Sequence, residues 1–328
     1  MKRRWLAPLT PLYRLALALR NRRIENGSEP VRRLRYPVVS IGNLSTGGAG
    51  KTPLTIALAL ALQKHGLRVD VLSRGYGRQS KLAARVLCDG TAEDFGDEPL
   101  LIAHETNLPV YVAPQRYDAG LLAESEQSIS EQNHQPIVHL LDDGFQHRQL
   151  YRAVDILLLN RRDWQDTLLP AGNLREPLSA IHRANVIAIP ADEQELANEL
   201  QAWGWQRPIW RLRRNLEIPT VSSPVAAFCG IARPEQFFAG LEAAGLHLAA
   251  RAAFPDHHRY TAHDLDRLIS TAHAAGAKAV ITTEKDLVRL GKLASTFPAA
   301  LPLRTAHLRI EIEDQAAAID WLINRLVS

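Results

Sequence analysis

Short apolar runs alternate with helix-like stretches along residues 1–205. Runs rich in Val, Ile and Leu are typical of strands that are buried on both faces of a sheet. They predict strands at residues 36–41, 68–73, 84–87, 109–112, 135–143, 155–159 and 186–189. Helical patterns predict helices at residues 53–62, 96–105 and 116–127. This alternation indicates an α/β fold, in which helices flank a mostly parallel sheet.

A second alternating block begins near residue 223. Its predicted strands and helices are 225–229, 234–244, 247–254, 262–275, 278–283, 301–312 and 313–326. The polar, Arg-rich stretch 206–217 precedes this block and predicts a connection between two α/β lobes. The expected parts are an N-terminal segment, a core, a connecting segment and a second, smaller lobe, at 1–30, 31–205, 206–222 and 223–328. Ligands of such folds bind beyond the carboxyl ends of the strands, so a cleft between the lobes is the expected active site.

Positive charge is concentrated at the N-terminus. The whole chain carries a formal charge of +4, but residues 1–35 hold ten Lys or Arg and two acids, which leaves the remainder at −4. This distribution argues against nucleic acid as the partner of the whole chain. Cys88 and Cys229 lack C-x-x-C spacing, which favours reduced thiols in the cytosol over a zinc site.

The N-terminal segment predicts an interfacial helix at residues 9–22. Arg14 and two prolines interrupt its apolar run, more arginines follow, and the run is too short to span a bilayer, so neither an export signal nor a membrane span is expected. In this amphipathic, membrane-associated helix the arginines would face anionic headgroups. The residues expected to face acyl chains are Trp5, Leu9, Leu12, Tyr13, Ala16 and Leu19. The alternative is a helix that packs on the core of the protein itself.

The most informative motif is the glycine-rich segment 40–52, which lies between a predicted strand and a predicted helix. Its glycines let backbone N–H groups approach phosphate oxygens, and the helix N-terminus adds unpaired donors. Lys51 would reach the β- and γ-phosphates and the Thr52 hydroxyl would hold Mg²⁺. The residues expected to bind the nucleotide are Ser45, Thr46, Gly47, Gly48, Ala49, Gly50, Lys51 and Thr52. Ser45 stands where the strict P-loop pattern has its first glycine. The alternative is a Gly-rich turn that binds no nucleotide.

Four acids are candidates for phosphoryl-transfer chemistry. Asp142 and Asp143 end a buried strand and are expected to deliver carboxylate oxygens to Mg²⁺, although two acids before Gly144 are also compatible with a solvated turn. Asp97 and Glu98 begin the helix predicted at 96–105. Asp97 either caps this helix or takes the proton from an acceptor hydroxyl, with Glu98 near the metal.

Several loops present arginine beside Gly, Tyr or Pro, a combination that suits an acidic headgroup or a structural ion pair. The resulting substrate-binding candidates are Arg74, Tyr76, Arg116, His147 and Arg175. In the second lobe, His257 is expected to orient Asp97 across the cleft, and His258 to lie at the surface. Metal binding by this adjacent pair is not expected.

These motifs together closely resemble the tetraacyldisaccharide 4′-kinase family of lipid A synthesis. The matching segments occur in order along nearly the whole chain, at 40–52, 73–78, 96–99, 141–147, 170–177, 254–257 and 282–286. The form G-N-L-S-x-G-G-x-G-K-T is the P-loop of that family, which accounts for Ser45. A P-loop NTPase-like fold follows from the resemblance.

The resemblance also implies a reaction. The γ-phosphoryl group of ATP, with Mg²⁺, is transferred to the 4′-hydroxyl of a tetraacylated glucosamine disaccharide 1-phosphate, giving lipid IVA. The family's proposed base matches Asp97 and its assisting histidine matches His257. Its P-loop lysine matches Lys51. The family's substrate-contacting residues correspond to Arg74, Tyr76, Arg116 and Arg175. The resemblance leaves open whether Asp142 or Asp143 contacts the metal directly.

The family's N-terminal helix lies at the cytoplasmic face of the bacterial inner membrane. By resemblance, we expect a peripheral or monotopic monomer whose partners are the membrane surface and a lipid substrate, and not nucleic acid. The alternative is a membrane-recruited P-loop ATPase switch of the partitioning or metallochaperone type. Its loop usually begins with a signature lysine, where this chain has Thr46. A nucleotide-binding scaffold without turnover would leave Asp97 and Glu98 unexplained.

Overall fold

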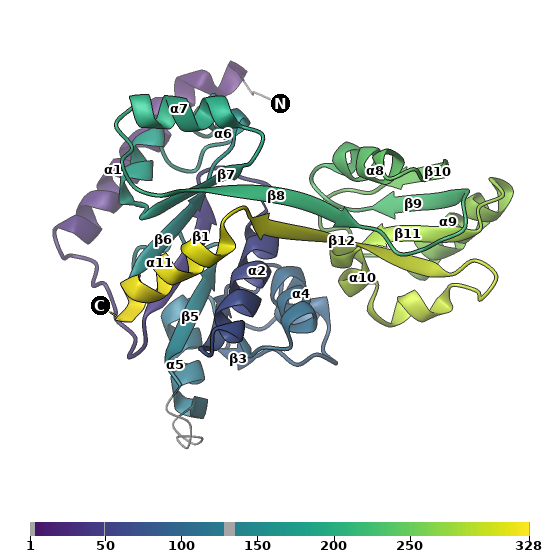
Figure 1. The fold of residues 1–328 in the computed structure, drawn as a ribbon, viewed down its shortest axis with the longest axis horizontal. Coiled ribbons are helices and arrows are strands. Elements are labelled where there is room, and N and C mark those ends of the chain that lie inside the picture. Colours follow the sequence, from purple (N-terminus) through teal and green to yellow (C-terminus); the bar gives the residue numbers. More distant parts are fainter. Residues whose placement is uncertain (1–3, 49, 128–134, 328) are drawn as a thin grey trace.

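The computed structural model describes residues 4–48, 50–127 and 135–327 (Figure 1). Over these residues one twelve-stranded sheet runs through both halves of the molecule, in the order β10-β9-β11-β12-β8-β7-β6-β1-β5-β2-β4-β3. Neighbouring strands pair in parallel except at β3–β4 and β8–β12, which are antiparallel. The predicted α/β fold with a mostly parallel sheet is confirmed.

The larger half holds the N-terminal elements. Its strands are β1 (Val38–Asn43), β2 (Arg68–Ser73), β3 (Ala84–Arg85), β4 (Val110–Val112), β5 (Ile137–Asp142), β6 (Val154–Leu158) and β7 (Val186–Pro190). Its helices are η1 (Arg4–Leu9), α1 (Thr10–Glu25), α2 (Lys51–Lys64), α3 (Ala92–Phe95), α4 (Asp97–Thr106), α5 (Arg116–Gln127), α6 (Arg161–Trp164), η3 (Leu178–Arg183) and α7 (Gln194–Ala202). Strand β1 is buried along its whole length, as its unbroken apolar run predicts.

The smaller half holds the C-terminal elements. Its strands are β8 (Ile209–Glu217), β9 (Val225–Cys229), β10 (Leu248–Ala253), β11 (Ala279–Thr283) and β12 (Leu303–Ile312). The helices of this part of the chain are α8 (Pro234–Ala243), α9 (Ala262–Ala274), α10 (Glu284–Leu290), η4 (Gly291–Thr296) and α11 (Gln315–Val327). Helix α11 returns to pack beside the larger half (Figure 1).

The two halves are joined by paired strands. The Arg-rich stretch expected to connect the lobes contains β8, which pairs in parallel with β7 at one end and antiparallel with β12 at the other. Figure 1 shows β8 and β12 crossing from one half to the other. Trp210 and Leu212 alternate with arginines in β8 and are buried, so the strand has the period of two that a half-buried strand needs. The arginines between them hid this pattern in the sequence.

Helix α10 was also missed by the sequence patterns. It begins directly after β11, and Thr283 is its N-cap, with a side chain that accepts a hydrogen bond from Asp286 N at 3.2 Å. Helix α10 packs against α4 of the larger half. This contact brings side chains of the smaller half against side chains of the larger half.

Helix α1 lies against loops at the carboxyl edge of the sheet. Tyr13 Oη donates to Arg175 O at 3.0 Å, and Arg20 Nη2 donates to Gln146 O at 2.8 Å. The prediction that Tyr13 faces acyl chains is therefore wrong, because its ring lies on the protein side of the helix. The outward side carries exposed apolar residues: Trp5, Leu9, Leu12, Leu15 and Leu19. Among the described residues, no helix combines the length and apolarity that crossing a bilayer requires.

Candidate active site

The glycine-rich segment connects β1 to α2. Gly50 is the N-cap of α2 with φ of 91°, and Gly47 has φ of 114°, a backbone region that favours glycine. Among the described residues, no side chain caps α2, so the backbone donors of its first turn are available to a ligand. Thr52 is buried in that turn. Ala49, also expected to contact nucleotide, lies outside the described residues.

Asn43, at the end of β1, forms hydrogen bonds with residues of the P-loop. Its Oδ1 accepts hydrogen bonds from Lys51 Nζ at 3.0 Å and from Arg175 Nη2 at 2.6 Å. Its Nδ2 donates to Ser45 Oγ at 3.0 Å. Ser45, at the position of the missing glycine, therefore fixes the loop through its hydroxyl, and Thr46 N donates to Asn173 O at 2.8 Å. Asn43 was not among the predicted site residues, although a polar residue at the end of an apolar strand could have indicated a place in the site.

The two strand-end acids have opposite environments. Asp143 lies 2.9 Å from Arg175 and 3.6 Å from Lys51, and these cations outweigh burial and lower the pKa of Asp143 to about 2. Asp142 accepts from Thr55 Oγ1 at 3.0 Å. Burial, then repulsion from Asp143 and Glu98, raises the pKa of Asp142 to about 6. A buried carboxylate with so little cationic compensation fits the oxygen-donor chemistry of Mg²⁺.

Asp97 meets two side chains of the smaller half. Its Oδ2 accepts from Arg289 Nε at 2.6 Å and pairs with His257 Nδ1 at 2.8 Å. Burial would raise the pKa of Asp97, but the hydrogen bond from His257 and the charge of Arg289 outweigh it and lower that pKa. Asp97 does not cap α4, because the N-cap is Gly96 and no side-chain cap is present. His257 itself has φ of 59°, a strained backbone conformation for a residue with a side chain.

Arg289, which sequence reasoning missed, is held by a buried carboxylate. Its side chain is 3% exposed, and its Nη1 donates to Asp286 Oδ1 at 3.1 Å and also to Gly230 O. Asp286 is fully buried and accepts from Tyr260 Oη at 2.9 Å and Gly230 N at 3.0 Å. This network fixes the guanidinium that contacts Asp97.

Glu98 follows Asp97 in the chain and acts electrostatically on Asp142, one of the strand-end acids. Its Oε1 accepts from Lys285 Nζ at 2.8 Å, and this ion pair outweighs burial and lowers the pKa of Glu98. The expected metal ligand is thus paired with a lysine of α10. It nevertheless lies close enough to Asp142 to contribute to the raised pKa of that residue.

The arginine candidates lie near the strand-end acids, since Asp142 and Asp143 both act on the charge of Arg116. Burial and the nearby charge of Arg74 lower the pKa of Arg116 to about 10, and burial with Arg116 lowers the pKa of His147 to about 4. The like charges of Arg74 and Arg116 thus lie close together, and together with burial they keep the neighbouring His147 neutral near pH 7. Tyr76 is exposed, with its ring centroid 5.8 Å from that of His257. The fifth candidate, Arg175, is instead bound to Asp143 and Asn43.

A cavity of about 1000 Å³ opens beside the P-loop. Its lining includes P-loop residues, the ends of β6 and β7, the middle of β8 and the start of α8, together with four acids, Asp163, Asp166, Asp192 and Glu193. Leu158, Leu212 and Ile310 give it an apolar surface, while Arg214 and Arg233 add positive charge. Apolar surface for a base beside donors for phosphates is the composition expected of a nucleotide site. None of these five residues was predicted.

Comparison with known proteins shows the family to which this chain belongs. The family model described as Tetraacyldisaccharide-1-P 4′-kinase matches residues 2–327. The chain belongs to the tetraacyldisaccharide 4′-kinase family. The family member from Koribacter versatilis is 40% identical over 327 residues, covering 96% of this chain and 97% of its own. That from Anaeromyxobacter dehalogenans strain 2CP-C is 39% identical over 305 residues, covering 85% and 79%.

A solved structure agrees with this tetraacyldisaccharide 4′-kinase assignment. LpxK from Aquifex aeolicus, crystallised in complex with ATP, superposes with a TM-score of 0.76 at 31% identity, covering 99% of this chain and 100% of the other. The resemblance drawn from the motifs is confirmed, and the chain is an ATP-dependent kinase of this family. Membership of this family does not favour the alternative function, a membrane-recruited ATPase switch.

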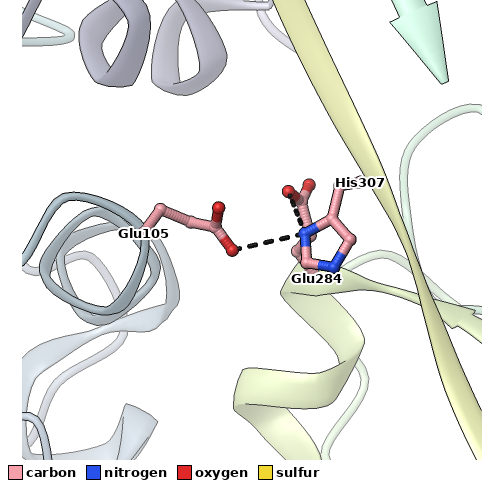
Figure 2. A group of neighbouring side chains, drawn as sticks. All are labelled: Glu105, Glu284 and His307. Atoms are coloured by element: carbon pink, nitrogen blue, oxygen red, sulfur yellow. Dashed lines mark hydrogen bonds and ion pairs between the residues drawn. The ribbon is translucent and has the colours of Figure 1, made fainter. Parts of the chain in front are cut away.

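A second cluster in this kinase resembles a metal site. Figure 2 shows Glu105 on α4, Glu284 at the start of α10 and His307 on β12 pointing toward one another. Their ligand atoms lie within 4.8 Å of one another. Arg309 Nη1, however, donates to Glu105 at 2.6 Å and to Glu284 at 3.3 Å. A guanidinium thus supplies the cation here, and the cluster is an ion-pair network between the two halves.

Proposed function

We propose that this kinase transfers the γ-phosphoryl group of ATP to the 4′-hydroxyl of tetraacyldisaccharide 1-phosphate, giving lipid IVA. The observation that carries this proposal is the convergence of a P-loop lysine with a cross-lobe dyad. Lys51 lies beside the strand-end acids, Glu98 lies near the same acids, and the adjacent Asp97 pairs with His257.

In the proposed step, Asp97 accepts the proton of the 4′-hydroxyl while that oxygen bonds to the γ-phosphorus. The bond between the γ-phosphorus and the β–γ bridging oxygen breaks, and ADP leaves. The hydrogen bond from His257 and the charge of Arg289 keep Asp97 ionised and oriented before proton transfer. Lys51 and the donors at the start of α2 would offset charge on the phosphates.

Mg²⁺ fits the oxygen donors Thr52, Asp142 and Asp143, and when bound it would neutralise phosphate charge. Of the two acids, we favour Asp142 as the direct ligand. Asp143 already pairs with Lys51 and Arg175, whereas Asp142 retains a raised pKa that a cation would relieve. Glu98 remains a candidate whose pairing with Lys285 must open before it can bind metal.

Arg74, Arg116 and His147 are proposed to bind the acidic disaccharide, with Tyr76 beside His257 and Arg175 nearest the strand-end acids. Mutual repulsion among these groups would be relieved by a phosphate of the substrate. His147 lies near α1, because the charge of Arg20 contributes to the lowering of its pKa, and a site near α1 is consistent with a substrate that stays in the membrane.

The outward leucines of α1 are proposed to insert into the cytoplasmic face of the inner membrane, as in a monotopic monomer. Trp5, Leu12, Leu15 and Leu19 are exposed, and Arg14 and Arg22 flank them on the same helix. An apolar stripe with adjacent arginines binds anionic lipid surfaces.

The reaction is tested with radiolabelled ATP and the acylated disaccharide 1-phosphate, with and without Mg²⁺. We expect label in the lipid product only when the acceptor and Mg²⁺ are both present. Acceptor-independent ATP hydrolysis that a protein partner or dimerisation controls would instead support a switch.

Membrane association is tested with the full chain carrying Leu15→Glu and Leu19→Glu. We expect binding to anionic vesicles to fall at least ~10-fold, because two charges enter the apolar stripe, while ATP affinity is unchanged. Leu121→Glu on α5 is the control, since Leu121 is also an exposed leucine, at 44% against 56% for Leu15 and 53% for Leu19. Equal vesicle binding by all three proteins would contradict the anchor.

A further inference from the structure

Two arginines beyond the P-loop lobe converge on the nucleotide cavity. Arg214 lies on β8, the strand that joins the halves, and Arg233 is the N-cap residue of α8. Both side chains line the cavity that P-loop residues 45–48 also line. The arginines and the P-loop therefore face a common space from different parts of the fold.

Arg214 reaches the head of helix α2. A Cβ placed on Gly50 would lie 3.9 Å from Arg214 Nη2. Gly50 is the N-cap of α2, so the guanidinium lies beside the backbone donors that bind phosphate in this kind of loop. Arg214 thus approaches the expected phosphate position from the side of β8.

These arginines lack the acidic partners that other arginines in the molecule have. Within the described residues, neither Arg214 nor Arg233 has an ion-pair or hydrogen-bond partner for its side chain. Nearby acids are engaged elsewhere: Glu193 accepts from Arg161 N at 2.6 Å, and Asp163 accepts from Asn160 Nδ2 at 3.0 Å. Asp163 acts on Arg233 only through its charge, so neither guanidinium is neutralised by direct pairing with a described residue.

The electrostatics of the two arginines favour an anion between them. Burial, then the charge of Arg233, lowers the pKa of Arg214. Burial and Arg162 lower the pKa of Arg233, with partial compensation from Asp163. Like charges held close together repel each other, and a polyanion between them would relieve that repulsion. Guanidinium groups also present forked donors that match phosphate oxygens.

We propose that Arg214 and Arg233 bind the polyphosphate chain of ATP, opposite the P-loop. ATP then bridges the P-loop of the larger half to β8 and α8. This inference rests on the proposed function, because it requires ATP in the cavity beside the P-loop. It adds two substrate-contacting residues that neither the motif nor the sequence pattern marks.

The test is equilibrium binding of Mg·ATP and of adenosine to the full chain and to Arg214→Gln and Arg233→Gln. We expect each variant to bind ATP about tenfold or more weakly, as loss of a charge-assisted hydrogen bond predicts, and adenosine within about twofold of the parent. Arg214→Lys should recover part of the ATP affinity. The melting temperature without nucleotide should not fall, because each substitution removes repulsion.

Arg213→Gln is the matched control. Arg213 is the neighbouring residue on β8, its Nε donates to Glu313 Oε1 at 3.0 Å, and it does not line the cavity. It should bind ATP like the parent.

Unchanged ATP affinity in both cavity variants would overturn the inference, as would equal losses for ATP and adenosine, which indicate a damaged base pocket. If the parent chain itself fails to bind ATP, the proposed function fails, and that result is distinct from either of these.

Discussion

Two ion-pair clusters connect helix α4 to the smaller half, and both are built from the same types of side chain. At the start of α4, Asp97 contacts His257 and Arg289. At its end, Glu105 contacts His307 (Figure 2). Glu105 also contacts Arg309. Each cluster joins a carboxylate of one half to a histidine and an arginine of the other. One is proposed to be catalytic and the other is a structural contact.

The larger pKa shifts belong to the structural cluster. Hydrogen bonding to Glu105 and Glu284 raises the pKa of His307 to about 9, and hydrogen bonding to His307 lowers the pKa of Glu105 to about 2. Both acceptors are also held by Arg309, and Glu284 accepts from Leu308 N as well. A strongly shifted pKa therefore marks good pairing here, and it does not identify the reactive site by itself.

What distinguishes the Asp97 cluster is its neighbourhood. Asp97 precedes Glu98, which acts electrostatically on Asp142, and His257 has a strained backbone and a ring near exposed Tyr76. Backbone strain of this kind tends to occur where function requires a particular side-chain direction. We therefore propose that proximity to the P-loop acids, and not the composition of a cluster, gives the Asp97 cluster a chemical role.

The largest expected effect is on turnover, when the carboxylate of each cluster is removed in a separate variant. Asp97→Ala should lower turnover at least ~10²-fold with ATP affinity largely kept, as loss of a general base predicts. Glu105→Ala, on the same helix, should keep turnover within about threefold, since it removes only an interlobe ion pair. The measurement is steady-state kinetics with the lipid acceptor. Near-parental turnover in Asp97→Ala, or equal losses in both variants, would refute the distinction.

A smaller effect is expected from the two histidines. His257→Gln should lower turnover about tenfold and move the acid limb of the pH–rate profile to higher pH, because the hydrogen bond that lowers the pKa of Asp97 is lost. His307→Gln should leave that limb in place. Because the pKa of Asp97 lies below its ordinary value of 3.8, the kcat profile must extend below pH 4 to measure the shift. An unmoved limb in His257→Gln would contradict the pairing of Asp97 with His257.

The smallest effect concerns stability and belongs to His307 alone. Its folded-state pKa of about 9 lies above the ordinary value, so its pairing stabilises the fold fully below about pH 6.5, and this contribution is lost as pH rises through 9. After solvent screening, His307→Gln should cost on the order of 1 kcal/mol at pH 6 and almost nothing at pH 10. Urea unfolding at both pH values measures this, and a difference independent of pH would exclude the ion-pair explanation.

Much of the fold was readable because local patterns decided it. Strands β2 and β9 have the predicted bounds, since unbroken apolar runs leave little choice of structure. The P-loop was recognised because strand, glycines and Lys51 are adjacent in the chain. Helix α10 and strand β8 were missed, because a short helix and an arginine-rich strand give weak periodicity.

The sequence by itself determined the family, the P-loop and, through the resemblance, the pairing of Asp97 with His257. Only the tertiary structure decided that Asn43 holds Lys51, that Arg289 holds Asp97 and that Arg214 reaches the head of α2. The physical reason is sequence distance. Asp97 and Arg289 are 192 positions apart, and their contact arises from the packing of α4 on α10. No local pattern encodes such a contact, because it depends on which surfaces the whole sheet brings together.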